Sequence, residues 1–413
     1  MRNEVPAVSE TRQWSRLMDL AEIGAIPGNG VNRAALTAGD RAARRLVIGW
    51  AREIGASVSI DEAANLWLRV EGSDPDAAPV LTGSHMDSQP KGGRFDGAYG
   101  VIAGLEAIAA LHDAGIVTRR AIEVVAWTNE EGGRFAPGCT GSMSWAGVHP
   151  SHTWDDVTDD NGIFYGAALA EQLAAEADLP RRALHSVPHA YLEAHIEQGP
   201  LLEAERLDVG VVTGIQGSRW FLVTVDGESA HAGTAPLHLR HDAVIDAVRA
   251  ISALSAAMED PLDILRFTVG RMNVSPNASN SVADKVVFSI DLRHPDGPTL
   301  VERGDAILGI LKAAVRNCRV TLKENFHAMP VGFSPVVIAA VERAAEAVGV
   351  KSIHMASGAF HDAQFAATIA PAGMIFVPSL RGISHNPAEY TSPSQLAAGT
   401  RVLARALVDL ANS

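Results

Sequence analysis

The chain has 413 residues, 47% of them hydrophobic and 20% charged, a composition typical of a globular protein with more than one domain. Its formal net charge of -14 and its lack of Lys/Arg-rich runs argue against nucleic acid as a partner. Because no run of about eighteen apolar residues occurs and the N-terminal segment is too charged for a signal peptide, we expect a cytoplasmic protein without membrane contact.

The first part of the chain alternates strands with helices. We predict a buried strand over residues 78–85, a helix over 98–115, where apolar residues recur at helical spacing, and a second buried strand over 121–127. Because a strand, a crossover helix and a strand form a parallel sheet, ligands are expected outside the carboxyl ends of these strands. His85 and the adjacent Glu130 and Glu131 lie at those ends.

The alternation changes between about residue 213 and residue 330. The predicted elements there are a strand (219–226), a helix (242–258), two strands (265–274 and 285–294), a helix (300–317) and a strand (319–326). This βαββαβ order is that of a ferredoxin-like unit. A further buried strand is predicted over 372–378. The sequence therefore predicts an α/β domain with a mostly parallel sheet, residues 1–212 and 331–413, into which a small domain, residues 213–330, is inserted.

The glycine-rich loop of residues 83–100 carries groups that can bind a metal. His85, Asp87 and Asp96 lie within a dozen residues, and Glu131 at the end of the next strand would converge on the same sheet edge. Imidazole and carboxylate ligands suit zinc, manganese, cobalt or nickel, and the two cysteines form no C-x-x-C pair that would offer thiolates instead. Taken alone, the loop is equally compatible with a histidine beside solvated acids.

Two more histidines extend this pattern. His195 lies in the segment YLEAHIEQGP, where a core histidine bonded to the backbone is the alternative. His385 lies in a polar loop directly after the strand predicted over 372–378, where a solvated loop histidine is the alternative. Three histidines, one aspartate and one glutamate at the strand ends of one domain are enough to ligate two metal ions.

Eight segments, in this order along nearly the whole chain, resemble the amidase, hydantoinase/carbamoylase branch of the di-metal aminoacylase and carboxypeptidase clan: GSHMDS, GGRFDGAYGV, TNEEGGRF, EAHIEQGP, SAHAGTAP, NASNSVADKV, DLRHPD and GISHNPAEYT. The resemblance implies two divalent metal ions per chain (Zn, Mn, Co or Ni), Asp96 bridging them, with the ligands His85, Asp96, Glu131, His195 and His385. It also implies a substrate site lined by Gln198, His231, Asn280, Arg293 and Gly358.

The resemblance gives the adjacent glutamates separate roles. Glu131 binds a metal, whereas Glu130 faces the attacking water as general base. His231 is expected to reach across a dimer interface and stabilise the oxyanion. Asp87 either hydrogen-bonds a ligand imidazole or caps a turn. Arg293 has the fork geometry that matches a carboxylate, although without the resemblance a surface salt bridge would be the better interpretation.

The implied activity is hydrolysis of the ureido C–N bond of an N-carbamoyl-L-amino acid, which gives the amino acid, carbon dioxide and ammonia. The 213–330 domain would serve as a lid and as the contact of a homodimer. Allantoate or β-ureidopropionate are alternative substrates, and Phe360 leaves substrate size open because the family pattern has glycine there. A peptidase or aminoacylase is disfavoured by His195, where related peptidases usually have aspartate. A non-catalytic binding protein is disfavoured because all five ligands and the base are present.

Overall fold

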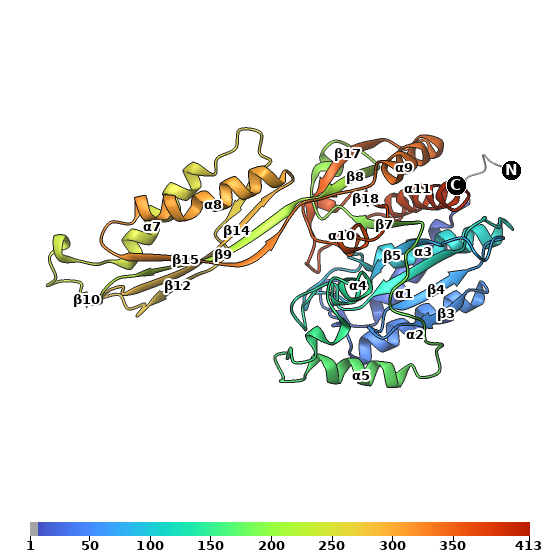
Figure 1. The fold of residues 1–413 in the computed structure, drawn as a ribbon, viewed down its shortest axis with the longest axis horizontal. Coiled ribbons are helices and arrows are strands. Elements are labelled where there is room, and N and C mark those ends of the chain that lie inside the picture. The colour runs from blue at the N-terminus through green and yellow to red at the C-terminus, as the bar shows by residue number, and fades with distance from the viewer. Residues whose placement is uncertain (1–6) are drawn as a thin grey trace. The chain divides into compact units, whose positions relative to one another are not determined.

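The structure is a computed structural model that describes residues 7–413. Two compact units are present (Figure 1). The first consists of the segment as far as Thr213 together with Gly332–Ser413, and the second consists of Gly214–Val331.

One mixed sheet forms the centre of the first unit. Within the described residues it has nine strands in the order β16-β8-β18-β7-β5-β6-β4-β3, with β17 paired to β8. Their bounds are β3 Ser57–Ile60, β4 Leu66–Val70, β5 Val80–His85, β6 Ile122–Trp127, β7 Ala190–Ile196, β8 Val209–Ile215, β16 Val331–Gly332, β17 Ser352–Ser357 and β18 Ala372–Val377. Strands β18, β7, β5 and β6 are parallel, which confirms the parallel sheet predicted from the sequence. Antiparallel pairs flank this group on both sides, and the sequence analysis did not predict them.

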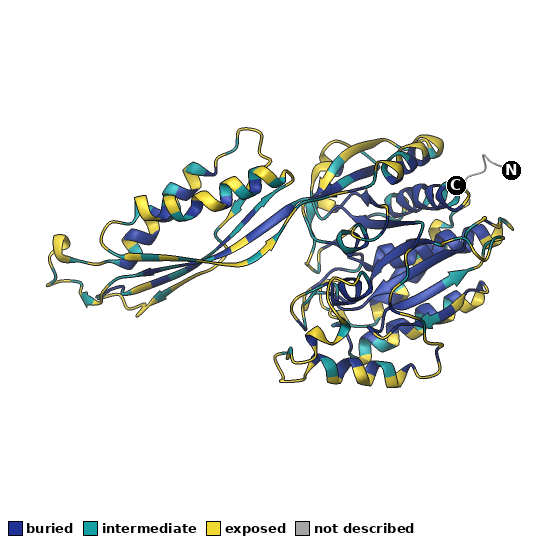
Figure 2. Ribbon diagram, in the orientation of Figure 1, coloured by how far each residue is buried: buried dark blue, intermediate teal, exposed yellow. Residues whose placement is uncertain are grey.

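The four central strands are buried along their whole length (Figure 2), as expected for parallel strands with helices on both faces. Helices α3 (Ala98–Asp113) and α11 (Pro393–Ala411) pack against each other and against these strands. The predicted helix after β5 is thereby confirmed. Gly100 permits close packing there, since a Cβ at this position would lie 2.4 Å from the carbonyl oxygen of Ala194.

The remaining elements of the first unit are mostly helical. The helices are α1 Glu10–Glu22, α2 Ala38–Glu53, α4 Thr140–Trp145, α5 Tyr165–Ala175, α6 Leu201–Ala204, α9 Pro335–Val348 and α10 Ala363–Ala366. Short elements are the strands β1 Ala25–Ile26 and β2 Gly30–Val31 and the 3-10 helices η1 Ser151–Trp154 and η3 Leu380–Gly382.

The second unit has the βαββαβ order that the sequence predicts. Its main elements are β9 Gly217–Asp226, α7 Ala243–Ala257, β11 Arg266–Thr268, β12 Met272–Ser275, β14 Lys285–His294, α8 Gly297–Ala314 and β15 Arg319–Ala328. The sheet is antiparallel in the order β11-β14-β9-β15, with β12 also on β14. Along β14 buried residues alternate with more exposed ones, so one face packs on α7 and α8. Outside this sheet lie β10 Ala230–His231, η2 Leu237–Leu239 and β13 Ser281–Val282.

One predicted strand of this unit differs in detail. Residues 265–274 form two short strands, β11 and β12, instead of one. Thr268 of β11 pairs with Asp291 of β14, and Met272 of β12 pairs with Phe288 of β14. Between these two pairs, the segment that joins β11 to β12 has one residue more than β14. The extra residue is a β-bulge next to Gly270, and glycine commonly marks such breaks.

Within residues 7–413, no helix combines the length and the apolar content that crossing a membrane would require.

Candidate metal centre

The predicted ligands come from neighbouring parallel strands, at their carboxyl ends. His85 is the last residue of β5, which confirms the strand end predicted for it, and His195 is the residue before the end of β7, a strand that the sequence analysis did not predict. Glu131 follows β6, and His385 follows β18. Asp96 lies in the loop between β5 and α3. This edge is where α/β sheets usually bind their ligands.

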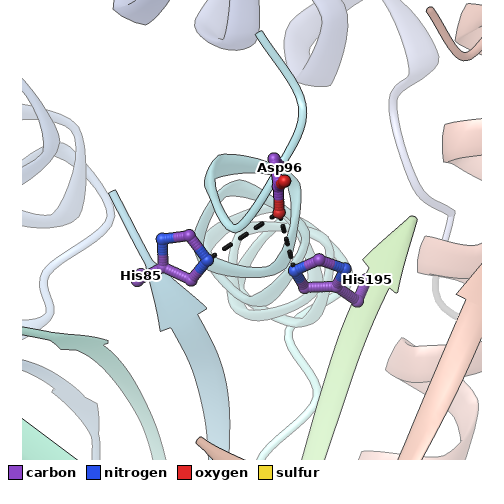
Figure 3. Close-up of side chains that lie close together, drawn as sticks. All are labelled: His85, Asp96 and His195. Carbon is purple, nitrogen blue, oxygen red and sulfur yellow. Dashed lines mark ion pairs between the residues drawn. The ribbon is translucent and has the colours of Figure 1, made fainter. Parts of the chain in front are cut away.

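The first group of side chains consists of His85, Asp96 and His195, whose ligand atoms lie within 4.8 Å of one another. Figure 3 shows both imidazoles directed at the same carboxylate oxygen: Asp96 Oδ1 lies 3.2 Å from His195 Nε2 and 3.9 Å from His85 Nε2. All three residues are buried. We name this group the first triad.

A second triad shares Asp96 with the first and adds Glu131 and His385. His385 Nε2 lies 3.3 Å from Asp96 Oδ2 and 3.4 Å from Glu131 Oε2. Each oxygen of Asp96 therefore faces a different triad. This is the arrangement that a carboxylate bridging two cations requires, and the ligand roles themselves stay a prediction.

Backbone carbonyls fix the two buried imidazoles. His85 Nδ1 lies 2.9 Å from the carbonyl oxygen of Asp87, and His195 Nδ1 lies 2.9 Å from that of Ile196. With Nδ1–H donating to these oxygens, Nε2 of each ring is turned toward Asp96. The carboxylate of Asp87 instead accepts the backbone N–H groups of Glu130 and Glu131, each at 3.2 Å. Of the two roles considered for Asp87, turn capping is therefore the one that its carboxylate has.

The two adjacent glutamates point to different partners. Glu130 Oε2 lies 3.3 Å from His85 Nε2, beside the first triad. Glu131 is held by Gln89, whose backbone N–H lies 3.1 Å from Oε1 and whose amide nitrogen lies 2.9 Å from Oε2. Gly97, with a φ of 62°, allows the loop to approach, since a Cβ there would lie 2.2 Å from His85 Nε2.

The charge of this site fits a bound cation. Burial, and then the charge of Asp96, raise the pKa of Glu131 to about 8. Burial, followed by the charges of Asp362 and Glu131, raises the pKa of Glu130 well above its usual value. Burial lowers the pKa of His85 to about 4, so its imidazole is neutral and able to ligate at neutral pH. A divalent cation would offset the repulsion among the carboxylates, and imidazole plus carboxylate is a donor set that such cations accept.

Sequence analysis missed several buried groups around the triads. Glu193 accepts hydrogen bonds from the hydroxyls of Ser84 (2.7 Å) and Tyr191 (2.9 Å) and from the backbone N–H of Ala363 (3.0 Å). The ring of His361 lies 4.5 Å from that of His195, and its Nε2 lies within hydrogen-bond distance of a serine hydroxyl. Glu193 lies in the segment YLEAHIEQGP and His361 directly follows Phe360, but only contacts distant in sequence distinguish these two residues.

The predicted substrate residues fall into two sets. Gln198 reaches the triads, since its amide nitrogen lies 3.0 Å from Asp96 Oδ2, and Gly358 follows β17. His231, Asn280 and Arg293 belong to the second unit.

The class of protein that this fold and site define is a metal-dependent α/β hydrolase. Residues 81–409 match the family model described as Peptidase family M20/M25/M40, and the chain belongs to this family.

Known proteins similar to the chain over its whole length agree with this assignment. An N-carbamoyl-L-amino-acid amidohydrolase of Rhizobium meliloti is 40% identical over 98% of this chain and 97% of its own. An allantoate amidohydrolase of Bacillus subtilis (strain 168) is 34% identical over 95% of each chain. The crystal structure of an amidase of the hydantoinase/carbamoylase family from Burkholderia multivorans is 42% identical, with a TM-score of 0.92 over 99% of this chain and 100% of that chain.

Proposed function

We propose that this protein is an amidohydrolase that cleaves the ureido C–N bond of an N-carbamoyl-L-amino acid or a related ureido acid. The observation that carries the proposal is the pair of triads that share Asp96, with Glu130 beside them and outside both. The names of the similar proteins, which include N-carbamoyl-L-amino-acid and allantoate amidohydrolases, support ureido acids as the substrate class.

The two triads would hold two divalent cations, with Asp96 as the shared ligand. When bound, such cations polarise a carbonyl group and lower the pKa of a bound water. Glu130 is the group that would take a proton from the attacking water and pass it to the departing nitrogen. Its position 3.3 Å from a triad imidazole and its burial, which favours proton uptake, support this role.

Gln198 offers an acceptor for the ureido group. Its amide nitrogen is engaged by Asp96 Oδ2 at 3.0 Å and the hydroxyl of Ser384 at 3.2 Å. Its Oε1 is buried and has no hydrogen-bond partner within the described residues. A buried carbonyl oxygen without a donor is costly, and a ureido N–H is a donor that would satisfy it.

The proposal is tested by measuring metal content and turnover together. After dialysis against manganese, zinc, cobalt or nickel, we expect about two ions per chain. The loaded protein should release ammonia from at least one member of a panel of N-carbamoyl-L-amino acids, allantoate and β-ureidopropionate. Two bound ions without hydrolysis of any member would overturn the substrate class. Failure to bind metal would favour a non-catalytic binding protein.

Arg293 is proposed to bind the carboxylate of the substrate. Its guanidinium already holds Asp291 through Nε (3.0 Å) and Nη2 (2.8 Å), so the fork is oriented. Arg293→Ala should lower kcat/KM for substrates with a carboxylate by roughly 10–100-fold, the value of a charged hydrogen bond or two. The control substrate is an N-carbamoyl amino acid amide, which lacks the carboxylate. If Arg293→Ala lowers kcat/KM for this neutral substrate by the same factor, the assignment of Arg293 to the carboxylate is contradicted.

His231 and Asn280 cannot contact the same small substrate as Arg293 of the same chain. His231 pairs with Ser281, and the backbone N–H of Ala232 donates to the carbonyl of Asn280, so these two residues lie together beyond the Lys285 end of β14. Arg293 lies near the other end of β14, roughly 25 Å away at the rise of an extended strand. We therefore propose that a second copy of the chain supplies His231 and Asn280 to each site.

Exposed apolar side chains of the second unit support a homodimer. On α7, Ile245 and Val248 are 46% and 55% exposed, and on the segment before it Leu237 and Leu239 are 79% and 64% exposed. Apolar side chains gathered on one unit in this way are typical of an interaction surface.

Mixing two inactive variants tests this arrangement. If His231 acts on the partner's substrate, each mixed dimer of His231→Ala and Glu130→Gln contains one intact site. An equal mixture that exchanges subunits should then recover about a quarter of wild-type activity, because half of the dimers are mixed. Activity no greater than that of the separate variants, with exchange verified by mass spectrometry, would place His231 in its own chain's site or outside catalysis.

A further inference from the structure

Glu389 is a buried carboxylate next to the triads that belongs to neither of them. It is 2% exposed and follows His385 in the segment SHNPAEY. One of its oxygens, Oε1, accepts the backbone N–H groups of Phe95 at 2.9 Å and Asp96 at 3.1 Å. Burying a further carboxylate beside Asp96 is unfavourable unless its hydrogen bonds compensate for the lost hydration.

The same side chain also closes the turn that carries His385. The hydroxyl of Ser384 lies 3.0 Å from Glu389 Oε2, and the backbone N–H of Glu389 donates to the carbonyl of Asn386 at 3.0 Å. His385 therefore lies between two residues that Glu389 binds. Its own backbone has a φ of 52°, in the left-handed region that non-glycine residues rarely adopt without support.

Packing around Glu389 supports a fixed position. A Cβ at Gly93 would lie 2.0 Å from Glu389 Oε1 and 2.5 Å from its Cβ, so the 93–97 loop fits closely over the glutamate. The next residue, Tyr390, packs edge-on against the ring of Phe95 at 6.1 Å between centroids. The dipeptides 95–96 and 389–390 are thus joined by both hydrogen bonds and ring contact.

The two triads differ in how much they need such support. His85 and His195 are buried and belong to strands of the sheet. The His385 side chain is 50% exposed and lies in a loop, so the sheet does not hold it. Glu389 links this loop to the backbone of Asp96, the residue that both triads share.

We propose that Glu389 is a positioning residue for the second triad: by reaching the backbone amides of Asp96 and its neighbour, it sets the separation of Asp96 and His385 and so the affinity for the second cation. The inference rests on the proposed two-cation function. It predicts that the length of the side chain matters and that its charge does not.

Two conservative variants separate these possibilities. Glu389→Gln keeps the reach and still offers Oε1 to both backbone amides. Glu389→Asp keeps the charge but is one carbon shorter. Metal-free protein would be titrated with manganese or zinc against a competing chelator, with His385→Ala as the reference for loss of the second triad. We expect Glu389→Asp to weaken the second binding step about 10–100-fold, as for other groups that orient ligands, with Glu389→Gln within about threefold of wild type.

Asp246 provides a matched control in the second unit. Its buried carboxylate accepts the backbone N–H groups of three consecutive residues, Arg316, Asn317 and Cys318, so Asp246→Glu makes a comparable change of reach away from the triads. Both binding steps should stay at wild-type strength in this variant. Weakening there as large as in Glu389→Asp would mean that the titration reports general loss of structure, and would overturn the inference.

The remaining outcomes are also decisive. If Glu389→Gln binds the second cation weakly while Glu389→Asp binds it normally, the charge of the side chain and not its length determines the effect. If Glu389→Asp weakens both binding steps equally, the role of Glu389 is structural. Either outcome overturns the inference. If the wild type binds two cations and Glu389→Asp does so equally well, only this inference fails. If the wild type binds fewer than two, the proposed function fails first.

Discussion

Glu130→Gln is expected to lower kcat by about 10²–10⁴-fold while both cations stay bound, because general-base catalysis contributes on this order. The glutamate carboxylate lies 3.3 Å from His85 but belongs to neither triad, so its replacement removes a proton acceptor and no ligand. Glutamine has nearly the same shape and cannot take a proton from water. Single-turnover and steady-state rates should be measured on protein whose metal content is determined by elemental analysis.

A second buried carboxylate near the site serves as the control for Glu130→Gln. Glu197 accepts the backbone N–H of Leu201 at Oε1 (2.7 Å) and that of Leu202 at Oε2 (2.9 Å) and belongs to neither triad, so glutamine there would lose one backbone hydrogen bond and no metal ligand. Glu197→Gln should therefore keep most of the activity. A near-normal rate in Glu130→Gln, or a loss of metal equal to its loss of rate, would remove Glu130 from the role of general base.

Much of the architecture could be predicted because it depends on local patterns. The apolar runs of β5 and β6, the helical spacing of α3 and the order of elements in the second unit are properties of short segments. The convergence of His85 and Glu131 also followed, since the carboxyl ends of neighbouring parallel strands meet at one edge. The pairing of strands at the flanks of the sheet could not be predicted, because it depends on partners far apart in the sequence.

The surroundings of the triads show the same limit. Glu193 and Glu389 act through hydrogen bonds to residues about 110–295 positions away, such as Ser84 and Phe95, and no spacing rule marks such residues. Asp87 illustrates a finer point. The sequence placed it near a ligand imidazole, but it is the backbone carbonyl that binds His85, while the carboxylate caps the turn of the two glutamates.

Asp96→Asn is expected to have the largest effect on metal binding, since it changes the one residue that both triads share. Its Oδ1 lies 3.2 Å from His195 Nε2, and its Oδ2 lies 3.3 Å from His385 Nε2. Asparagine keeps one oxygen but turns an NH₂ group, which is not a ligand, toward the other triad. Loss of a two-metal site worth several kcal/mol should lower kcat/KM by about 10³-fold or more.

Comparison with His385→Ala shows whether Asp96 joins the two triads. His385 belongs to the second triad alone. Its loss should therefore abolish binding of the cation at the second triad and leave binding of the cation at the first triad, which contains His85 and His195, unchanged. Asp96→Asn should weaken both steps, because it removes an ionised carboxylate that lies between the two sites. Burial raises the pKa of Asp96, but the hydrogen bonds from His195 and His385 outweigh burial and hold this pKa well below its usual value. Two tightly bound ions in Asp96→Asn would mean that each triad is complete without it, and the shared carboxylate would then have no part in holding the cations.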